Sequence, residues 1–130
     1  MIFTKSQKKI LPIVFITIII VIFAGFFVTV NIINTHIKDR CTMAMNKYKL
    51  DCVDSLILWL DDNSNDYRSR NSAIWALGQI GDARALPTLQ KYYTGIIPEK
   101  ESFDRGLSQY ELKKAISYFQ GSLNLTRFFR

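Results

Sequence analysis

The chain has 130 residues, 17 of them Lys or Arg and 11 Asp or Glu, which gives a net charge of +6. This length suits one domain of modest size and an anchoring segment. Half of the excess charge comes from Lys5, Lys8 and Lys9, which directly precede an apolar run. Charge that flanks an apolar segment is better explained by a membrane than by nucleic acid, so the composition disfavours nucleic-acid binding.

Residues 10–30 contain no charged side chain, and 16 of these 21 positions are Ile, Leu, Val or Phe. As a helix they would be about 32 Å long, against about 30 Å for the hydrocarbon core of a bilayer. A cleaved signal peptide is disfavoured because the run is longer than about 15 residues and no Ala-x-Ala site follows it. The sequence therefore predicts a transmembrane signal anchor over residues 10–33, after a basic tail at residues 1–9.

The charges on the two sides of this anchor predict its orientation. Three lysines precede it, whereas Lys38 and Arg40 follow it and are opposed by Asp39. The positive-inside rule then places the N-terminus in the cytoplasm and the C-terminal domain on the extracytoplasmic side of a single-pass protein.

Cys41 and Cys52 both follow the anchor. In an exported domain, a turn between them would allow a disulfide that closes a loop of about eleven residues. Two buried free thiols are the alternative. The chain has no Cys-x-x-Cys, and its one histidine, His36, lies next to the anchor, so no metal site is expected.

Apolar residues at helical spacing predict four helices after a linker or capping segment at residues 34–50. Asp51 and Asp66 suit the N-caps of the first two. Gly81 suits the left-handed position that ends the second, and Asp82 suits the next N-cap. The predicted helices cover residues 52–60, 66–80, 83–93 and 109–120.

Three further residues of this region have predicted structural roles. Arg70 lies four residues after Asp66, so the two are expected to pair across the first turn of their helix. Gly78 lies inside a helix, where a missing side chain allows a close helix–helix approach. Pro87 lies in the opening turns of the third helix and is expected to bend it.

The last helix has the clearest start signal. Ser108 and Glu111 have capping-box spacing, in which each side chain satisfies the other's backbone N–H. Gly121 ends the helical region 51–121, and a tail follows at residues 122–130.

Residues 71–87 read Asn-Ser-Ala-Ile-Trp-Ala-Leu-Gly-Gln-Ile-Gly-Asp-Ala-Arg-Ala-Leu-Pro. This stretch resembles the HEAT-like repeat family, of the short bacterial, PBS-lyase type. The resemblance implies an all-α fold, a short α-solenoid of about two antiparallel helix pairs. In this chain the solenoid would follow the one N-terminal transmembrane helix that the apolar run predicts. Tyr67, Ser69 and Ala83 depart from the family's pattern, which affects the details of the turns.

Two repeats are fewer than the three or so that solenoids usually need, so something is expected to cover the open ends. The candidates are the segment 34–50, the C-terminal tail with Phe128 and Phe129, or another protein.

No Ser/His/carboxylate set, Cys/His set or phosphate-binding glycine loop is present, so the sequence predicts no catalytic residue and no cofactor. Asp61, Asp62 and Asp66 are interpreted as a solvated turn, with cation binding as the alternative. The predicted function is a non-catalytic, membrane-anchored module for protein–protein interaction or scaffolding, whose partner is another protein. A set of aromatic residues supports this function, because aromatic side chains favour contact surfaces, with filling of the core as the alternative for each of them. They are Trp59, Tyr67, Trp75, Tyr92, Tyr93, Tyr110 and Tyr118.

Two alternatives to this function stay open. One is an exported accessory domain that acts at anionic membrane surfaces through a basic and aromatic C-terminus. The other is a HEAT protein that binds nucleic acid or assists an enzyme. The residues that motivate the first alternative are Lys113, Lys114, Arg127, Phe128, Phe129 and Arg130.

Overall fold

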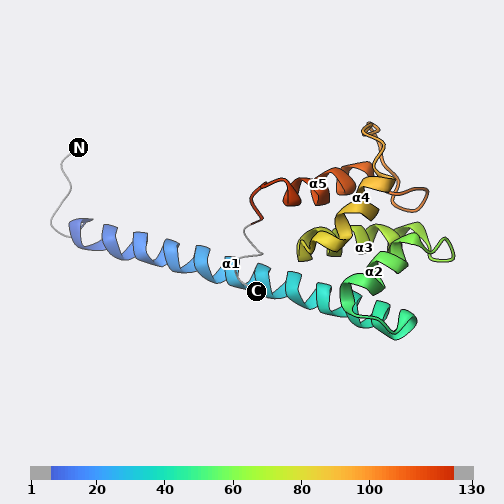
Figure 1. Ribbon diagram of the computed structural model, residues 1–130. Helices are drawn as coiled ribbons and strands as arrows, with labels where there is room; N and C mark the ends of the chain where they lie inside the picture. The colour runs from blue at the N-terminus through green and yellow to red at the C-terminus, as the bar shows by residue number, and fades with distance from the viewer. Residues whose placement is uncertain (1–6, 125–130) are drawn as a thin grey trace. The chain divides into compact units, whose positions relative to one another are not determined.

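The computed structural model describes residues 7–124, with side chains from residue 10 onward (Figure 1). Every regular element within that range is helical, so the predicted all-α fold is confirmed. The chain divides into two compact units, Met1–Asn34 and Thr35–Arg130. The helix α1 belongs to both units, and the remaining helices belong to the second.

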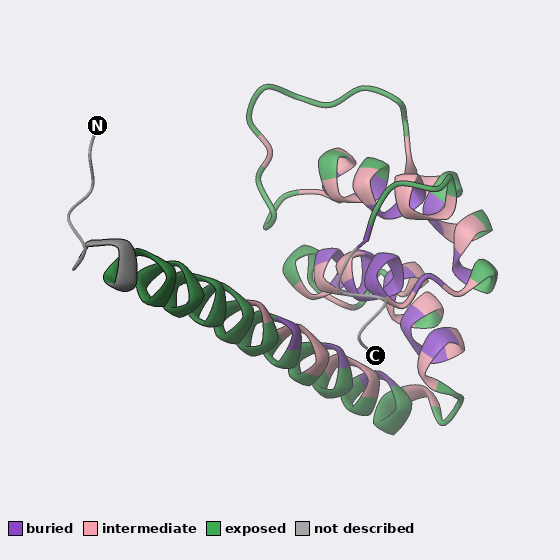
Figure 2. Cartoon of the chain, turned by 90° about the vertical axis from the view of Figure 1, so that its left-hand side faces the viewer, coloured by how far each residue is buried: buried purple, intermediate pink, exposed green. Residues whose placement is uncertain are grey.

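The helix α1 spans Gln7–Tyr48 and is long and apolar enough to cross a membrane. The side chains of residues 10–25 are all exposed (Figure 2), and the most apolar window has a mean hydropathy of 3.1. The hydroxyl of Thr17 donates to the Ile13 carbonyl at 2.9 Å, which satisfies a polar group within the apolar stretch.

The segment expected to link the anchor to the repeats is itself helical as far as Tyr48. No glycine or proline interrupts residues 26–48, so the helix has no local reason to end earlier. It stops at Lys49, whose φ of 61° lies in the left-handed region.

The second unit contains two helix pairs after the end of α1. The first pair is α2 (Cys52–Asp61) and α3 (Tyr67–Ile80). The second is the short 3-10 helix η1 (Ala83–Ala85) continued by α4 (Leu86–Tyr92), together with α5 (Gln109–Phe119). The central helix α3 packs against both α2 and α5, and α4 packs against α5 (Figure 1).

The core of this unit is formed by the inward faces of the helices (Figure 2). Burying one leucine side chain stabilises the fold by about 1.5–3 kcal/mol, so a few such residues account for much of the stability. The largest side chains with almost no solvent contact are Leu56, Leu60, Ile74, Leu77, Leu89 and Leu112.

Local capping explains where the helices begin. The Asp51 carboxylate accepts hydrogen bonds from the backbone N–H groups of Val53 and Asp54, at 2.9 and 3.1 Å. Asp66 accepts from the Ser69 N–H at 2.9 Å. The helix α3 ends at Gly81, whose φ of 66° is the left-handed conformation in which glycine has no steric cost.

The predicted single helix over residues 83–93 is wrong in one respect. The structure has a 3-10 turn over Ala83–Ala85, and α4 begins only at Leu86, with Pro87 in its first turn. Proline has no N–H and a fixed φ, so it is tolerated in the first turn of a helix. Inside a helix it would remove a backbone hydrogen bond and clash with the carbonyl four residues earlier, so one α-helix does not run through both Ala83 and Pro87.

The helices α3 and α5 approach closely at Gly78. A methyl group built on Gly78 would lie 2.7 Å from the Cβ and 2.9 Å from the Cα of Ala115. Carbon atoms at van der Waals separation are about 3.5–4.0 Å apart, so no larger residue fits without moving one of the helices. This close approach of α3 and α5 sets the distance between the two helix pairs.

Candidate binding groove

A groove of about 740 Å³ runs beside α3 in the second unit. Ser69, Ser72 and Trp75 of α3 form its floor, and Arg40 and Met43 of α1 form one wall. Phe103 of the loop before α5 and Glu111 of the first turn of α5 form the opposite wall, since α3 lies between α1 and α5 (Figures 1 and 2). A groove of this volume lies in the range of about 300–1,000 Å³ that is typical of ligand sites in proteins.

Asn71 holds the loop wall in place. Its side-chain N–H groups donate to the carbonyls of Phe103 and Gly106, at 3.1 and 2.9 Å. Its side-chain oxygen accepts from the Ser108 N–H at 2.8 Å. Asn71 is 4% exposed. One buried amide on α3 therefore shapes the whole segment from Phe103 to Ser108, which brings the Phe103 ring to the groove.

The start of α5 has a different cap from the predicted capping box. Ser108 accepts from the Glu111 N–H at 3.0 Å, but the Ser108 N–H is taken by Asn71, so Glu111 does not complete the box. Glu101 supplies the capping carboxylate instead, since it accepts from the Gln109 and Tyr110 N–H groups at 2.7 and 3.1 Å. The Glu111 side chain is thereby left to line the groove.

The charged groups of the groove differ in what they contact. Arg68 forms an ion pair with Asp104 at 2.9 Å, which crosses from α3 to the loop wall. Within residues 7–124, neither the Arg40 guanidinium nor the Glu111 carboxylate has a hydrogen-bond or ion-pair partner. Among the described residues, one wall therefore presents an unpaired positive group and the other an unpaired negative group.

The α1 wall is held by contacts with α2 and the turn that follows it. The Lys47 ammonium lies 2.9 Å from the Asp62 carboxylate, and the Tyr48 hydroxyl donates to the same carboxylate at 2.6 Å. Hydrogen bonds from Ser64, Tyr48 and Lys47 hold the pKa of Asp62 well below its usual range. The ring of Tyr48 also packs edge-on against Trp59, with 6.1 Å between centroids.

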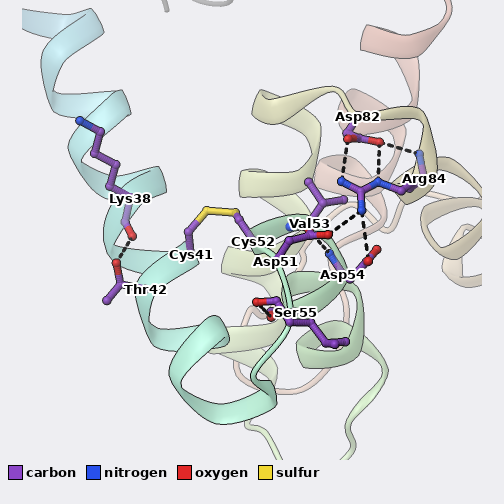
Figure 3. The surroundings of a disulfide bond; sticks show 11 residues. Lys38, Cys41, Thr42, Asp51, Cys52, Val53, Asp54, Ser55, Asp82 and Arg84 are labelled. Carbon is purple, nitrogen blue, oxygen red and sulfur yellow. Dashed lines mark hydrogen bonds and ion pairs between the residues drawn. A yellow bond between two sulfur atoms is a disulfide. The ribbon is translucent and has the colours of Figure 1, made fainter.

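In the structure, Cys41 of α1 and Cys52 of α2 form a disulfide, with 4.8 Å between their Cα atoms (Figure 3). It closes a loop between positions eleven residues apart. The bond joins the α1 wall covalently to α2. We expect it to stabilise the folded state, because it lowers the conformational entropy of the unfolded chain.

Reducing this disulfide is expected to lower the free energy of unfolding by about 2–3 kcal/mol, because the unfolded chain regains the entropy of the open loop. Urea unfolding of the full chain in detergent, with and without dithiothreitol, measures the effect. The variant C41S/C52S is the control and should not respond to reductant. Equal unfolding midpoints for the oxidised and reduced wild type would contradict the prediction.

Arg70 is placed differently from the expectation that it pairs with Asp66. Its side chain points inward and is 5% exposed, and its Nε donates to the Leu60 carbonyl at 2.8 Å. The last carbonyls of a helix have no partner within the helix, so Arg70 satisfies one at the end of α2. Its guanidinium also lies over the rings of Tyr67 and Tyr92. Arg70 therefore joins α2 to α3.

Arg84 joins the two helix pairs at their surface (Figure 3). One of its terminal nitrogens lies 2.8 Å from Asp51 and 3.1 Å from Asp54, and the other lies 3.0 Å from Asp82. Asp82 also caps the 3-10 turn through the Arg84 N–H. Two N-cap carboxylates, one from each pair, thus share one guanidinium.

The ion pair between Arg84 and Asp51 predicts how the stability of the fold depends on pH. The hydrogen bond from Arg84, followed by that from the Asp54 N–H, lowers the pKa of Asp51 to about 2, against about 3.9 in unfolded chains. The Asp51 carboxylate therefore stabilises the fold above about pH 4 and loses this contribution as the pH falls toward about 2.

The variant D51N can still cap α2 but carries no charge. Its urea midpoint is expected to fall less steeply than that of the wild type between about pH 4 and pH 2. The same amide change at the exposed Glu99 is the control and should leave the slope unchanged. If the urea midpoint of D51N fell as steeply with pH as that of the wild type, the Asp51 carboxylate would not be the group that causes the loss of stability.

The three aspartates considered as a cation site do not act together. Asp61 accepts from Tyr92 at 2.6 Å and lies 2.9 Å from Lys91, Asp62 binds Lys47, and Asp66 caps α3. In the part of the chain that the structure describes, no group of three or more His, Cys, Asp or Glu side chains is arranged to hold a metal ion.

Several residues selected from the sequence thus lie at caps and helix contacts, not in the groove. Sequence reasoning missed Asn71, Glu101, Arg40 and Phe103 as residues that form the site. Only Asn71 carried a signal, since a polar residue on the apolar face of a helix suggests a buried hydrogen-bonding role. The tail residues Arg127, Phe128, Phe129 and Arg130 lie outside the described residues, and Lys113 and Lys114 are on α5.

The paired helices, with α3 packed against its counterpart α5, place this protein among helical-repeat proteins of the α-solenoid type. Residues 69–94 match the family model of the PBS lyase HEAT-like repeat, so the chain carries a HEAT-like repeat, as the sequence predicted. The match covers most of α3, the 3-10 turn and α4. Comparisons with curated proteins and with solved structures give no match.

Proposed function

We propose that this protein is a non-catalytic, membrane-anchored helical-repeat module that binds another protein through the groove beside α3. The HEAT-like repeat supports an interaction module, because repeat solenoids use their helix faces as binding surfaces. The observation that carries the proposal is the groove itself, whose walls present side chains without partners in the described part of the chain.

The composition of the groove supports protein binding more than chemistry. Trp75, Phe103 and Met43 line it, and aromatic residues and methionine are enriched at protein interfaces. Met43 and Phe103 are 48% and 47% exposed. Arginine is also enriched at protein interfaces, and Arg40 lines the groove. The carboxylates of the groove, Asp66 and Glu111, come without a histidine or cysteine nearby to form a nucleophile–base set.

The anchor is the second part of the proposal. The apolar part of α1 would hold the module at the membrane, with the N-terminus in the cytoplasm and the repeats on the extracytoplasmic side. The lysines before the apolar stretch that starts at residue 10 and a disulfide in the second unit support this orientation. A reporter enzyme that is active only outside the cytoplasm, fused after Arg130, tests it. Activity of the fusion is expected, and an inactive fusion that is present in the membrane would overturn the orientation.

Site-specific photo-crosslinking tests the binding function. A photoreactive p-benzoylphenylalanine is introduced in place of Arg68, which lines the groove and has an exposed side chain. The matched control carries it in place of Gln90, which is exposed on α4 and does not line the groove. Irradiated membranes are expected to yield a discrete protein adduct from position 68 and none from position 90. The absence of an adduct at position 68, or the same adduct at both positions, would overturn the proposal.

An exported domain that acts on anionic membrane surfaces is the second candidate function. It depends on the basic and aromatic tail, which lies outside the described residues, and on the lysines of α5, of which Lys113 is exposed. Its binding to anionic vesicles would weaken with salt. The groove favours the interaction module over this candidate.

A further inference from the structure

The two walls of the groove carry opposite charges that have no partner in the part of the chain that the structure describes. Arg40 is on the α1 wall and Glu111 is on the first turn of α5, with α3 as the floor between them. Neither charged group has a partner within residues 7–124, whereas the other two, Arg68 and Asp66, are taken up by an ion pair and a helix cap. The groove is therefore electrostatically polarised across its width.

Apart from its four charged residues and Asn71, the groove is lined by apolar side chains and by serines. Trp75 is partly buried and lines the groove, as do the exposed side chains of Met43 and Phe103. Ser69 and Ser72 are one helical turn apart on the floor, so an occupant can approach the α3 backbone closely there. This arrangement offers an apolar anchor site between a positive and a negative group.

We propose that the groove binds a peptide segment of another protein in which an apolar or aromatic residue lies between an acidic and a basic residue. The acidic side chain faces Arg40, the basic side chain faces Glu111, and the apolar side chain packs on Trp75 between Met43 and Phe103. This inference rests on the proposed interaction function and specifies the chemistry of the partner. Charge complementarity sets which segments bind and in which direction they lie.

The test uses the full chain in detergent and a random-peptide display library as the probe. The wild type is compared with the charge-swapped variant R40E/E111R and with the neutral variant R40Q/E111Q. The wild type is expected to enrich peptides with one order of acid, apolar residue and base, and the swapped variant is expected to enrich the reverse order. The neutral variant should keep the apolar preference but lose the charge order.

Binding of a selected peptide is then measured through the fluorescence of Trp75, in a W59F background that leaves Trp75 as the only tryptophan. The single variant R40E is expected to weaken binding about tenfold, because a like charge then faces the acidic residue of the peptide. R40E/E111R should recover affinity for a peptide with its two charges exchanged. Circular dichroism melting of each variant verifies that the fold is retained.

Three results would overturn the inference. One is enrichment of peptides with no charge order in the wild type. The second is a concentration-dependent dimer that R40E abolishes, which would assign the groove to a second copy of this chain. The third is binding of anionic vesicles that R40E weakens, without any peptide enrichment. If the adduct at position 68 persists in these cases, the interaction function stands and only the chemistry of the partner is wrong.

Discussion

Replacing Gly78 with alanine is expected to lower the free energy of unfolding by about 3 kcal/mol, because the added methyl group overpacks the interface between α3 and α5. The methyl carbon would lie 2.7 Å from the Ala115 Cβ and 2.9 Å from its Cα. The second of these is a backbone atom, so a side-chain rotation cannot relieve the clash and one helix must shift. An ordinary helical glycine would instead gain about 1 kcal/mol from this change.

Urea unfolding of G78A and of the wild type in detergent measures the difference. G106A is the matched control, since no atom of the described residues lies within 4 Å of a methyl group built there, and its stability should change by less than about 0.5 kcal/mol. The double variant G78A/A115G should recover part of the loss, because it removes the clash with the side chain of residue 115 and leaves the clash with its backbone. A G78A protein as stable as the wild type would show that the two helices can separate at no cost.

Replacing Asn71 with aspartate is expected to destabilise the fold by about 3 kcal/mol and to release the loop wall of the groove. Aspartate keeps the oxygen that accepts from the Ser108 N–H, but it cannot donate to the carbonyls of Phe103 and Gly106. It would place a buried carboxylate against two carbonyl oxygens, and burial of an unpaired charge is costly. The side chains are nearly equal in size, so the change isolates hydrogen bonding from packing.

Urea unfolding measures the loss in N71D, and limited proteolysis of residues 101–107 measures release of the loop. The same change at the exposed Asn63 is the control, and N63D should behave as the wild type. Because N71D removes the loop wall, it should also abolish selection of charged peptides by the groove. Wild-type stability together with an intact protease-resistant loop would refute the role assigned to Asn71.

The extent to which the candidate site could be predicted depends on how far apart in sequence its interacting groups are. The caps at Asp51, Asp66 and Ser108 bind N–H groups two or three residues away, so a local pattern suffices to find them. Glu101 caps α5 from eight and nine residues upstream, across a loop. Its role exists only because that loop folds back, and the capping-box pattern pointed to Glu111 instead.

Arg70 shows the same limit. The spacing of Arg70 and Asp66 suggested a pair across one turn, but the apolar face of α3 turns Arg70 toward the end of α2. A partner ten residues away, the Leu60 carbonyl, then competes better than a surface carboxylate, because a buried helix end needs a donor.

The all-α class, the apolar length of α1, the HEAT-like repeat and the helix boundaries near glycine and the capping residues follow from local sequence patterns, since helical periodicity and capping act within a few residues. The groove and its polarity depend instead on contacts between residues that are far apart in the sequence. Asn71 reaches partners 32, 35 and 37 residues away, and Arg40 and Glu111 come from α1 and α5. Packing of α3 against α5 sets which distant groups share one surface, and no local pattern in the chain encodes that arrangement.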